Sequence, residues 1–430
     1  MGRARGANAL MALAFENPYG IPPTSGFFLM PEVSDDLGEE QALVASDLIG
    51  QGREPMVPSL DVIKNEGSIV VPVDMRYFGL WLKLHYGAPT TTPGLPATGS
   101  YTFSAQPVTG SKITVNGTDV TFVTATPSGN QVKIGATLLD TLTSLVLLLN
   151  ASADNGIKVA TYSLDPSGNK FAIEHDTIGT VGNSFTITAG SSPDSKATAS
   201  GATLTGGSAT GAYNHVFTSG ALTLPSVSIE DGYPDVPEFY MNFGIVSDKL
   251  AIALQRSGLL NATVTYIAQG ESDPTAATAA GTPTKFAFTR FAQFTGDVSR
   301  SGVPLGDLET GNFTVANNYD KAEILRRDGR IGGADPGSIS NTGQAVCRYK
   351  GSELRNLARN GTPVDLTYGW RIALAARLSF TFHEVYLPRP KKSRSGPGGI
   401  RETYDWQSAI NAAVGRSCTV TLVNDVPSYG

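Results

Sequence analysis

Short apolar segments separated by turn residues recur through the second half of the chain, and this spacing limits the fold more than any other feature. Five strand candidates follow one another closely: Val216–Phe217, Leu222–Ile229, Tyr240–Val246, Lys249–Leu254 and Ala262–Ala268. Ser247-Asp248 fits a tight hairpin turn between two of them. The apolar segments Trp370–Phe382 and Ser417–Leu422 extend the pattern towards the C-terminus. Many short strands at close spacing predict a mainly β fold.

The composition supports this prediction and narrows the class of protein. The 48 Gly and 26 Pro in 430 residues favour strands joined by turns over helical bundles. Hydrophobic residues make up 40%, which is enough for sizeable cores and argues against wholesale disorder. The formal net charge is −6, whereas gripping nucleic acid requires clustered Lys and Arg. An acidic surface instead suits the wall of a channel that DNA passes without sticking.

The N-terminal segment and the cysteines bear on the compartment. The apolar run Ala9–Phe15 follows Arg3 and Arg5 and loosely imitates a secretory signal. The run is at the short limit of about 7 residues for such a signal, so a structured N-terminal arm is favoured. No apolar stretch approaches the ~20 residues of a membrane span. Cys347 and Cys418 fit small buried residues in a reducing cytoplasm, and a disulfide between them stays open.

A helix interrupts the strand pattern in the first hundred residues. Ser68–Val73 reads as a strand, and Asp74 is placed to cap a helix that runs through His85 and stops at Gly87. Its apolar positions recur at three- and four-residue steps, which predicts one buried face. The Thr- and Pro-rich segment 88–94 that follows has the composition of a linker.

The block from residue 98 to 207 has a different texture. Lys112–Val123 alternates on both sides of Asn116-Gly117, which predicts a β-hairpin. A helix over residues 135–150 and strands at 170–175, 184–188 and 202–204 complete a compact α+β unit. We therefore predict a discontinuous β-rich domain, 1–97 and 208–430, with a small α+β domain inserted at 98–207 between flexible flanks.

No constellation of residues predicts an enzyme, a metal site or a cofactor site. The four histidines, His85, His175, His215 and His383, lack metal-binding spacing. Neither a Gly-x-Ser-x-Gly elbow nor a P-loop occurs. Residues 329–333 are Gly-rich, but they follow a charged loop and not a strand, so a flexible loop is expected.

Two charged segments are candidate contact sites. The acidic segment carries Glu32, Asp35, Asp36, Glu39 and Glu40. Paired acids suit glycoside hydrolysis or calcium binding, but the spacing favours a solvated loop. The basic segment carries Arg389, Lys391, Lys392, Arg394 and Arg401. An exposed hairpin tip between strands that end near Leu387 and resume near Ile400 is favoured over a DNA contact, and in an assembling protein it would be a contact arm.

Four segments resemble the major tail tube proteins of siphophages, the long-tailed bacteriophages. They are Met11–Pro23, Gly67–Pro89, His215–Gly220, and Cys418–Asp425 with Tyr429 near the end. Within the 98–207 block, four further segments are similar to a domain that recurs in phage virion proteins. They are Ile113–Gly117, Ile134–Thr137, Leu149–Ser152 and Ala202–Gly207.

The resemblance implies a fold of two packed β-sheets, a sandwich or barrel with a flanking helix. It also implies hexameric rings that stack into the tail tube and conduct DNA during ejection, in a virion protein made in the host cytoplasm. Expected partners are further copies of the chain and the tape measure, baseplate or distal tail, and tail terminator proteins. Ring closure would also pair the open sheet edges that burden a lone subunit.

Two specific expectations follow from the tail tube resemblance. The inserted domain should project from the outer face of the tube, because its flanks suit a loop insertion that leaves the core intact. The basic arm should meet the acidic segment of the neighbouring ring, through many pairs that are individually weak. Two other classes of protein stay open: another virion component (baseplate, decoration or host-surface adhesion protein), and a secreted hydrolase that uses the clustered carboxylates.

Overall fold

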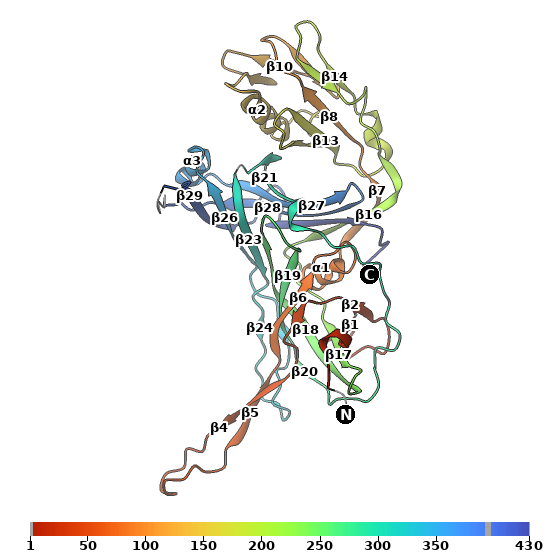
Figure 1. Ribbon diagram of the computed structural model, residues 1–430, viewed down its shortest axis with the longest axis vertical. Coiled ribbons are helices and arrows are strands. Elements are labelled where there is room, and N and C mark those ends of the chain that lie inside the picture. Colours follow the sequence, from red (N-terminus) through yellow and green to blue (C-terminus); the bar gives the residue numbers. More distant parts are fainter. Residues whose placement is uncertain (1–2, 306, 392–396, 430) are drawn as a thin grey trace. The chain divides into compact units, whose positions relative to one another are not determined.

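The computed structural model describes residues 3–305, 307–391 and 397–429, and its fold is mainly β (Figure 1). The chain forms two compact units, each built from three stretches of sequence. Unit 1 comprises Met1–Pro89, Phe217–Gln293 and Thr310–Gln344, and unit 2 comprises Thr90–Val216, Phe294–Glu309 and Ala345–Gly430. The predicted boundaries of an inserted domain at 98 and 207 stay a prediction.

Unit 1 consists of antiparallel strands and one helix. Its strands are β1 (Leu10–Phe15), β2 (Phe28–Met30), β3 (Ser34–Asp35), β4 (Glu40–Val44), β5 (Ser59–Lys64), β6 (Glu66–Pro72), β17 (Val227–Tyr233), β18 (Glu238–Leu254), β19 (Asn261–Ile267), β20 (Gly270–Glu271), β24 (Asp320–Lys321) and β25 (Ala334–Asp335). β23 (Leu308–Ala316) and β26 (Ser340–Arg348) contain residues of both units. A 3-10 turn, Gly6–Asn8, precedes β1.

The long strand β18 belongs to two sheets. Its first half pairs with β17 and β20, and β17 continues to β1 and β2. Its second half pairs with β19 and β23, and β19 continues to β6 and β3. The predicted hairpin turn at Ser247-Asp248 is therefore wrong: the strand runs through it, and the register with β19 shifts between Ser247 and Lys249. The polar pair marks a bulge, at which a strand bends and twists more strongly, and not a reversal of the chain.

The helix α1 (Phe78–Tyr86) packs against β18, but eight of its nine residues are buried, so burial is not confined to the one face that the apolar spacing predicts. The Asp74 carboxylate accepts the backbone N–H groups of Arg76 at 2.9 Å, Tyr77 at 3.2 Å and Phe78 at 2.9 Å. The predicted cap is thus confirmed, and Gly87 follows the last helical residue. Burial raises the pKa of Asp74 to about 6, although these three bonds act in the opposite direction. The predicted strand before the cap is β6.

Unit 2 contains the remaining elements. They are β7 (Thr90–Leu95), β8 (Thr98–Phe103), β9 (Lys112–Val115), β10 (Thr118–Val123), β11 (Gln131–Lys133), α2 (Leu138–Asn150), β12 (Ala160–Leu164), β13 (Lys170–His175), β14 (Ile187–Ala189), β15 (Ala197–Ala199), β16 (Ser208–Thr218), β21 (Gly296–Arg300), β22 (Val303–Pro304), α3 (Glu353–Asn360), β27 (Val364–Ala373), β28 (Ala376–Tyr386), β29 (Arg401–Ser408) and β30 (Cys418–Asn424), with 3-10 turns at Thr180–Ser184 and Gln293–Thr295. The last two residues of β16 and the first residue of the turn Gln293–Thr295 belong to unit 1. β21, β27, β28 and β30 form consecutive pairs, and β29 pairs with the end of β28.

Residues 98–207, called the insert below, supply all the buried residues of one hydrophobic core except Ala97 and Val303. Two four-stranded sheets, β11-β10-β9-β14 and β12-β13-β8-β15, accompany α2. The predicted Asn-Gly hairpin is β9–β10, and the predicted helix is α2, capped by Thr137 and Asp140 in a capping box. The predicted strand 170–175 is β13. The strand predicted at 184–188 is wrong in its bounds, because a 3-10 turn ends at Ser184 and β14 begins at Ile187.

The segment before the insert is a paired strand and not a linker, contrary to the prediction. The supposed linker is largely β7, which pairs antiparallel with β16 from Thr90–Val216 to Leu95–Ser208. Thr is a good strand residue, and this pairing overrides the Pro and Gly that resemble a linker. The single strand predicted at Trp370–Phe382 is also wrong, because β27 ends at Ala373 and β28 begins at Ala376.

Candidate assembly surfaces

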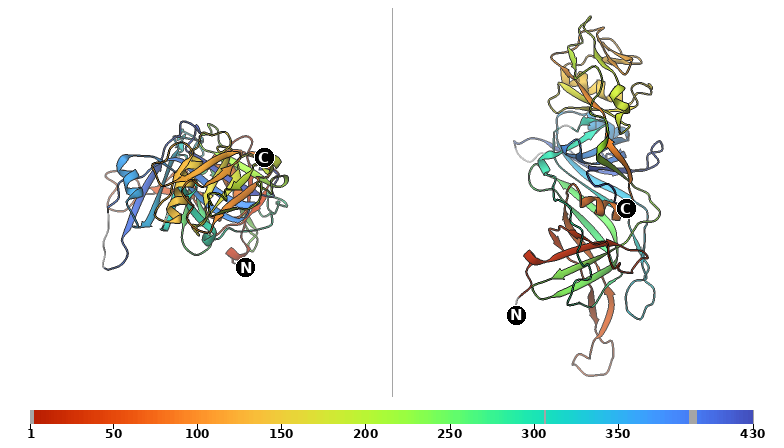
Figure 2. Two further views of the ribbon diagram at one scale, coloured as in Figure 1. Left: turned by 90° about the horizontal axis from the view of Figure 1, so that it is seen from above. Right: turned by 90° about the vertical axis from the view of Figure 1, so that its right-hand side faces the viewer.

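A hairpin extends from unit 1 (Figures 1 and 2), and many of its apolar side chains are exposed. This arm, residues 40–64, consists of β4, β5 and the segment between them. Among the described residues, eight exposed large hydrophobic side chains lie between positions 43 and 62: Leu43, Val44, Leu48, Ile49, Met56, Val57, Leu60 and Val62. Ile49 is 95% exposed and Val57 is 84% exposed. Large contiguous apolar patches on a soluble protein mark interaction sites, so we take the arm as the principal candidate surface.

Sequence reasoning missed this arm, although a signal was present. Residues 59–62 alternate between polar and apolar types, as in a half-buried strand. Only the structure shows that β4 and β5 pair with each other and that both lie at the surface. A strand pattern predicts burial against something, and for this hairpin the described part of the chain does not supply the covering surface.

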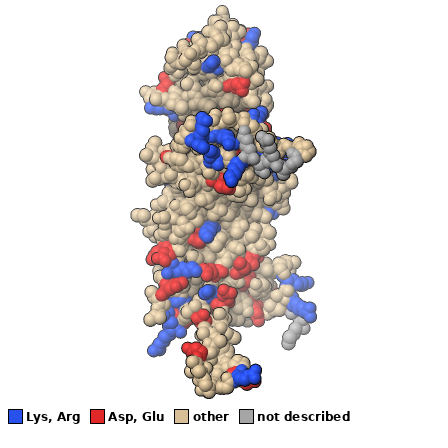
Figure 3. Space-filling view, turned by 90° about the vertical axis from the view of Figure 1, so that its left-hand side faces the viewer, with Lys and Arg blue, Asp and Glu red and all other residues tan. Residues whose placement is uncertain are grey.

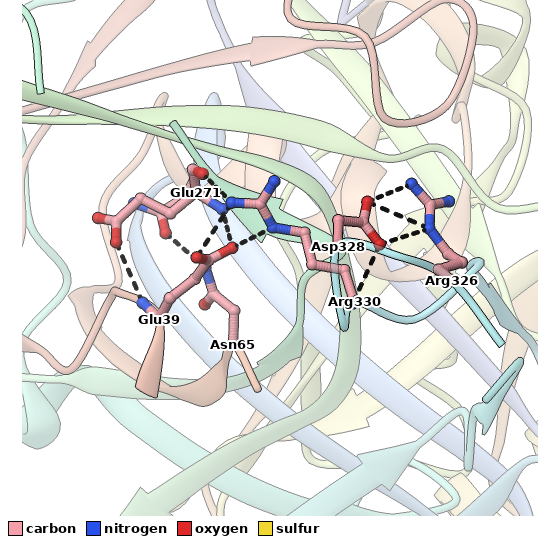
Figure 4. Close-up of polar contacts among 7 residues, drawn as sticks. Glu39, Asn65, Glu271, Arg326, Asp328 and Arg330 are labelled. Atoms are coloured by element: carbon pink, nitrogen blue, oxygen red, sulfur yellow. Dashed lines mark hydrogen bonds and ion pairs between the residues drawn. The ribbon is translucent and has the colours of Figure 1, made fainter. Parts of the chain in front are cut away.

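An ion-pair cluster fixes the base of the arm (Figure 4). Arg330 Nε donates to Glu39 Oε1 at 2.6 Å and Nη2 donates to Glu39 Oε2 at 3.0 Å, directly before β4. Arg330 Nη2 also donates to the Glu271 carbonyl oxygen of β20 at 2.6 Å. The Glu271 N–H donates to Glu39 Oε1 at 2.6 Å, and the Glu39 N–H donates to Glu271 Oε2 at 3.1 Å. Burial raises the pKa of the Glu271 carboxyl, and the nearby Glu39 charge adds to this shift.

Two further contacts hold the returning strand of the arm. The Ile63 N–H of β5 donates to the Gly329 carbonyl at 3.0 Å. Asn65, directly after β5, donates through Nδ2 to Asn242 Oδ1 of β18 at 2.7 Å, and both side chains are buried. The loop predicted to be flexible at 329–333 is thus tied to the arm through Gly329 and Arg330. The arm begins and ends at fixed positions on unit 1.

The acidic residues predicted from the sequence lie in unit 1, near the same base. The segment is not simply a solvated loop, because Ser34–Asp35 forms β3 and pairs with β6. Burial raises the pKa of the Glu32 carboxyl, and the neighbouring Asp35 carboxylate raises it further. Glu39 is engaged by Arg330, and Asp36 accepts the Ser68 N–H. Glu40 is exposed at the start of β4.

The predicted basic residues lie in unit 2, where Figure 3 shows Lys and Arg side chains gathered on one face. β28 ends at Tyr386 and β29 begins at Arg401, close to the predicted strand ends. Arg389 and Lys391 are exposed, whereas Lys392 and Arg394 lie outside the described residues. Arg401 and Arg348 both pair with Glu309, each at 2.5 Å. Pairing of this basic segment with an acidic segment of another subunit stays a prediction.

The histidines take part in hydrogen bonds within the fold. His85 Nδ1 lies 2.8 Å from Ser247 Oγ, and burial lowers its pKa to about 3. His215 Nδ1 lies 2.9 Å from Thr91 Oγ1, and its Nε2 lies 2.9 Å from the Val426 carbonyl oxygen. Among the described residues, no group of three or more His, Cys, Asp or Glu is arranged to hold a metal ion. Cys347 and Cys418 are both buried, and the described residues contain no disulfide between them.

Comparisons with known proteins give the family. In residues 3–305, 307–391 and 397–429, no helix has the length and apolar character that crossing a membrane requires. A search of curated proteins gave no match. The family model described as phage tail tube protein matches residues 6–408, which include the arm, the insert and most strands of both units. The chain therefore belongs to the phage tail tube protein family and is a structural protein of the virion.

Proposed function

We propose that this protein self-assembles as hexameric rings that stack into the tail tube of a siphophage, and that the tube conducts genomic DNA during ejection. The proposal extends the family membership to a specific assembly. The observation that carries it is the exposed apolar arm on a fixed base. The role is structural and not catalytic, and the subunit is made in the host cytoplasm before it enters the virion.

The occupant that we assign to the arm is a second copy of the chain. Every subunit of a tube carries the same arm, so an equal number of identical acceptor surfaces is needed, and the other subunits provide that number. A repeating contact between one patch and a different patch on the next copy builds a ring or a filament. The ion-pair cluster at Arg330 supports this assignment, because an arm with a fixed base loses less conformational entropy when it docks.

The charge of the chain agrees with the passage of DNA. The formal net charge of −6 disfavours tight binding to phosphates, which a conducting tube has to avoid. The remaining partners of a tail tube are the tape measure, baseplate or distal tail, and tail terminator proteins. The proposal includes a secondary contact, in which Arg389 and Lys391 of one ring meet acidic residues of the next ring.

Electron microscopy of the purified protein, with light scattering on the same sample, tests the proposal. Hollow rings or tubes with sixfold end views are expected. Replacing Ile49 and Val57 by Ser should raise the critical concentration for assembly. Burying each side chain is worth about 1.5–3 kcal/mol, so a loss of about 3 kcal/mol for the pair corresponds to at least ~100-fold.

The matched control replaces Leu222 and Leu259, which are also exposed hydrophobic residues of unit 1, by Ser. These replacements should leave the critical concentration near that of the original chain. Equal critical concentrations for the arm variant and the control would refute the role of the arm. A discrete trimer without a pore, formed by the unaltered chain, would refute the tube itself and favour a decoration or adhesion protein.

A further inference from the structure

A tight turn in unit 2 reaches into the insert. β21 and β22 pair antiparallel and are joined by Ser301-Gly302, with φ of 47° and 77°. Positive φ at both central residues is typical of a type I′ hairpin turn. The Asp365 carboxylate of β27 accepts the Ser301 N–H at 2.9 Å and also the Ser301 hydroxyl. The turn is therefore held on its own side by the sheet that carries β27.

On the other side, the turn completes the core of the insert. Val303 is only 8% exposed and belongs to the hydrophobic core that the insert residues form. The Ser301 carbonyl accepts Asn150 Nδ2 at 2.8 Å, at the last residue of α2. The Gly302 carbonyl accepts the Leu164 N–H at 2.8 Å, at the last residue of β12. One apolar contact and two hydrogen bonds thus join segments that are more than a hundred residues apart in sequence.

The fit leaves no room for a side chain at the tip of the turn. A Cβ atom at Gly302 would lie 2.0 Å from the Tyr162 carbonyl oxygen and 2.7 Å from Asn150 Nδ2. Asn150 Nδ2 also donates to the Tyr162 carbonyl oxygen at 2.8 Å, and the Tyr162 N–H donates to Asn150 Oδ1 at 3.0 Å. These bonds lie entirely within the insert, so they orient the Asn150 amide towards the turn independently of it.

We infer that the ends of α2 and β12 form a docking seat for the β21–β22 turn. This seat attaches the insert at a place separate from the β7–β16 flanks through which the chain enters and leaves, and an ion pair between Arg377 of β28 and Glu174 of β13 adds a further link. An insert held only by its flanks would pivot about them, whereas an insert held at two separate places has one orientation. The insert therefore keeps one orientation relative to the sheet that carries β27. This inference does not depend on the proposed tube.

Gly302→Ala in the full-length chain tests the seat, and Gly117→Ala is the matched control. Gly117 occupies the same position of the Asn116-Gly117 turn, with φ of 85°, but a Cβ there meets nothing within 4 Å. Both changes introduce the same type of backbone strain, and only the first forces the turn out of its seat. The hydrogen-exchange rate of the Leu164 amide measures directly whether the turn occupies the seat, because this N–H donates to the Gly302 carbonyl oxygen.

Gly302→Ala should speed exchange of the Leu164 amide at least ~10-fold, the factor for loss of a bond worth about 1.4 kcal/mol, and Gly117→Ala should leave it unchanged. If Gly302→Ala does not fold, Val303→Thr is the second variant, since it keeps the shape and places a hydroxyl in the core. Its expected result is faster exchange at Leu164 together with an earlier, separate unfolding transition of the insert. Unchanged protection of Leu164 in a folded Gly302→Ala or Val303→Thr protein would overturn the inference.

Discussion

Replacing Arg330 by Gln should loosen the base of the arm while unit 1 stays folded. Arg330 makes three charge-assisted bonds, two to the Glu39 carboxylate and one to the Glu271 carbonyl. The side chains of Arg330 and Glu39 are 24% and 18% exposed, so solvent screens this pair only partly. Bonds to charged groups are worth about 1.5–3 kcal/mol each, but three bonds from one side chain do not add. We expect a loss of about 2 kcal/mol in the local opening free energy.

Hydrogen exchange at the backbone measures this loss. A cost of about 2 kcal/mol corresponds to about 30-fold faster exchange of the Glu39 and Glu271 amides, whose acceptors belong to the cluster. The matched control is Arg326→Gln in the same loop. Arg326 pairs with Asp328 two residues away, at side-chain exposures of 35% and 36%. Exposed pairs of this kind are worth about 0–1 kcal/mol. Equal exchange rates in the two variants would refute the assignment of Arg330 as the residue that fixes the arm.

The remaining predictions concern pH and salt. Burial raises the pKa of Asp74 from 3.8 to about 6. The stability that Asp74 contributes is therefore complete below about pH 4 and is lost as pH rises through 6, at a cost of about 3 kcal/mol in the free energy of unfolding. Asp74→Asn should remove this loss, which urea unfolding at several pH values measures. Burial lowers the pKa of His85 from 6.5 to about 3, so its contribution is present above pH 6.5 and is lost as pH falls towards 3. His85→Gln should remove this loss of up to about 5 kcal/mol in the free energy of unfolding. The two groups lose their contributions in opposite pH directions. An unfolding free energy that changes with pH in the same way in Asp74→Asn and His85→Gln would therefore contradict the reasoning. The double variant Arg389→Glu, Lys391→Glu should raise the critical concentration for assembly at low salt. At about 1 M salt the Debye length is only ~3 Å, so this difference from the original chain should disappear. A critical concentration that stays raised at about 1 M salt would exclude an ionic contact.

The sequence predicts local structure well where a single signal has a local cause. The Asp74 cap, the Asn116-Gly117 hairpin and the Thr137-capped helix all depend on residues within a few positions of one another. The predictions failed where a distant pairing decides the outcome. Thr90–Leu95 resembles a linker until β16 pairs with it, and Ser247-Asp248 resembles a turn until β18 is seen to pass between two sheets.

The candidate site was harder to predict for the same reason. Charge is visible in the sequence, which is enough to indicate the acidic and basic segments as contact candidates. The apolar arm was not, since Leu43 or Ile49 reads as a core residue until the structure shows it exposed. Arg330 in turn depends on a contact with Glu39 that spans nearly three hundred positions. Residue type therefore indicates the chemistry of a contact, but only the fold shows which residues remain available for a partner.

The neck of the insert, where β7 and β16 pair down to Leu95 and Ser208, has an evolutionary consequence. Because the chain leaves and re-enters the sheet on adjacent paired strands, a foreign module whose ends lie close together would fit there without disturbing the register. The neck is therefore a place where one module can replace another while the β7–β16 pairing is kept. A replacement module would have to meet one requirement set by the rest of unit 2, because it would need an apolar surface that buries Val303.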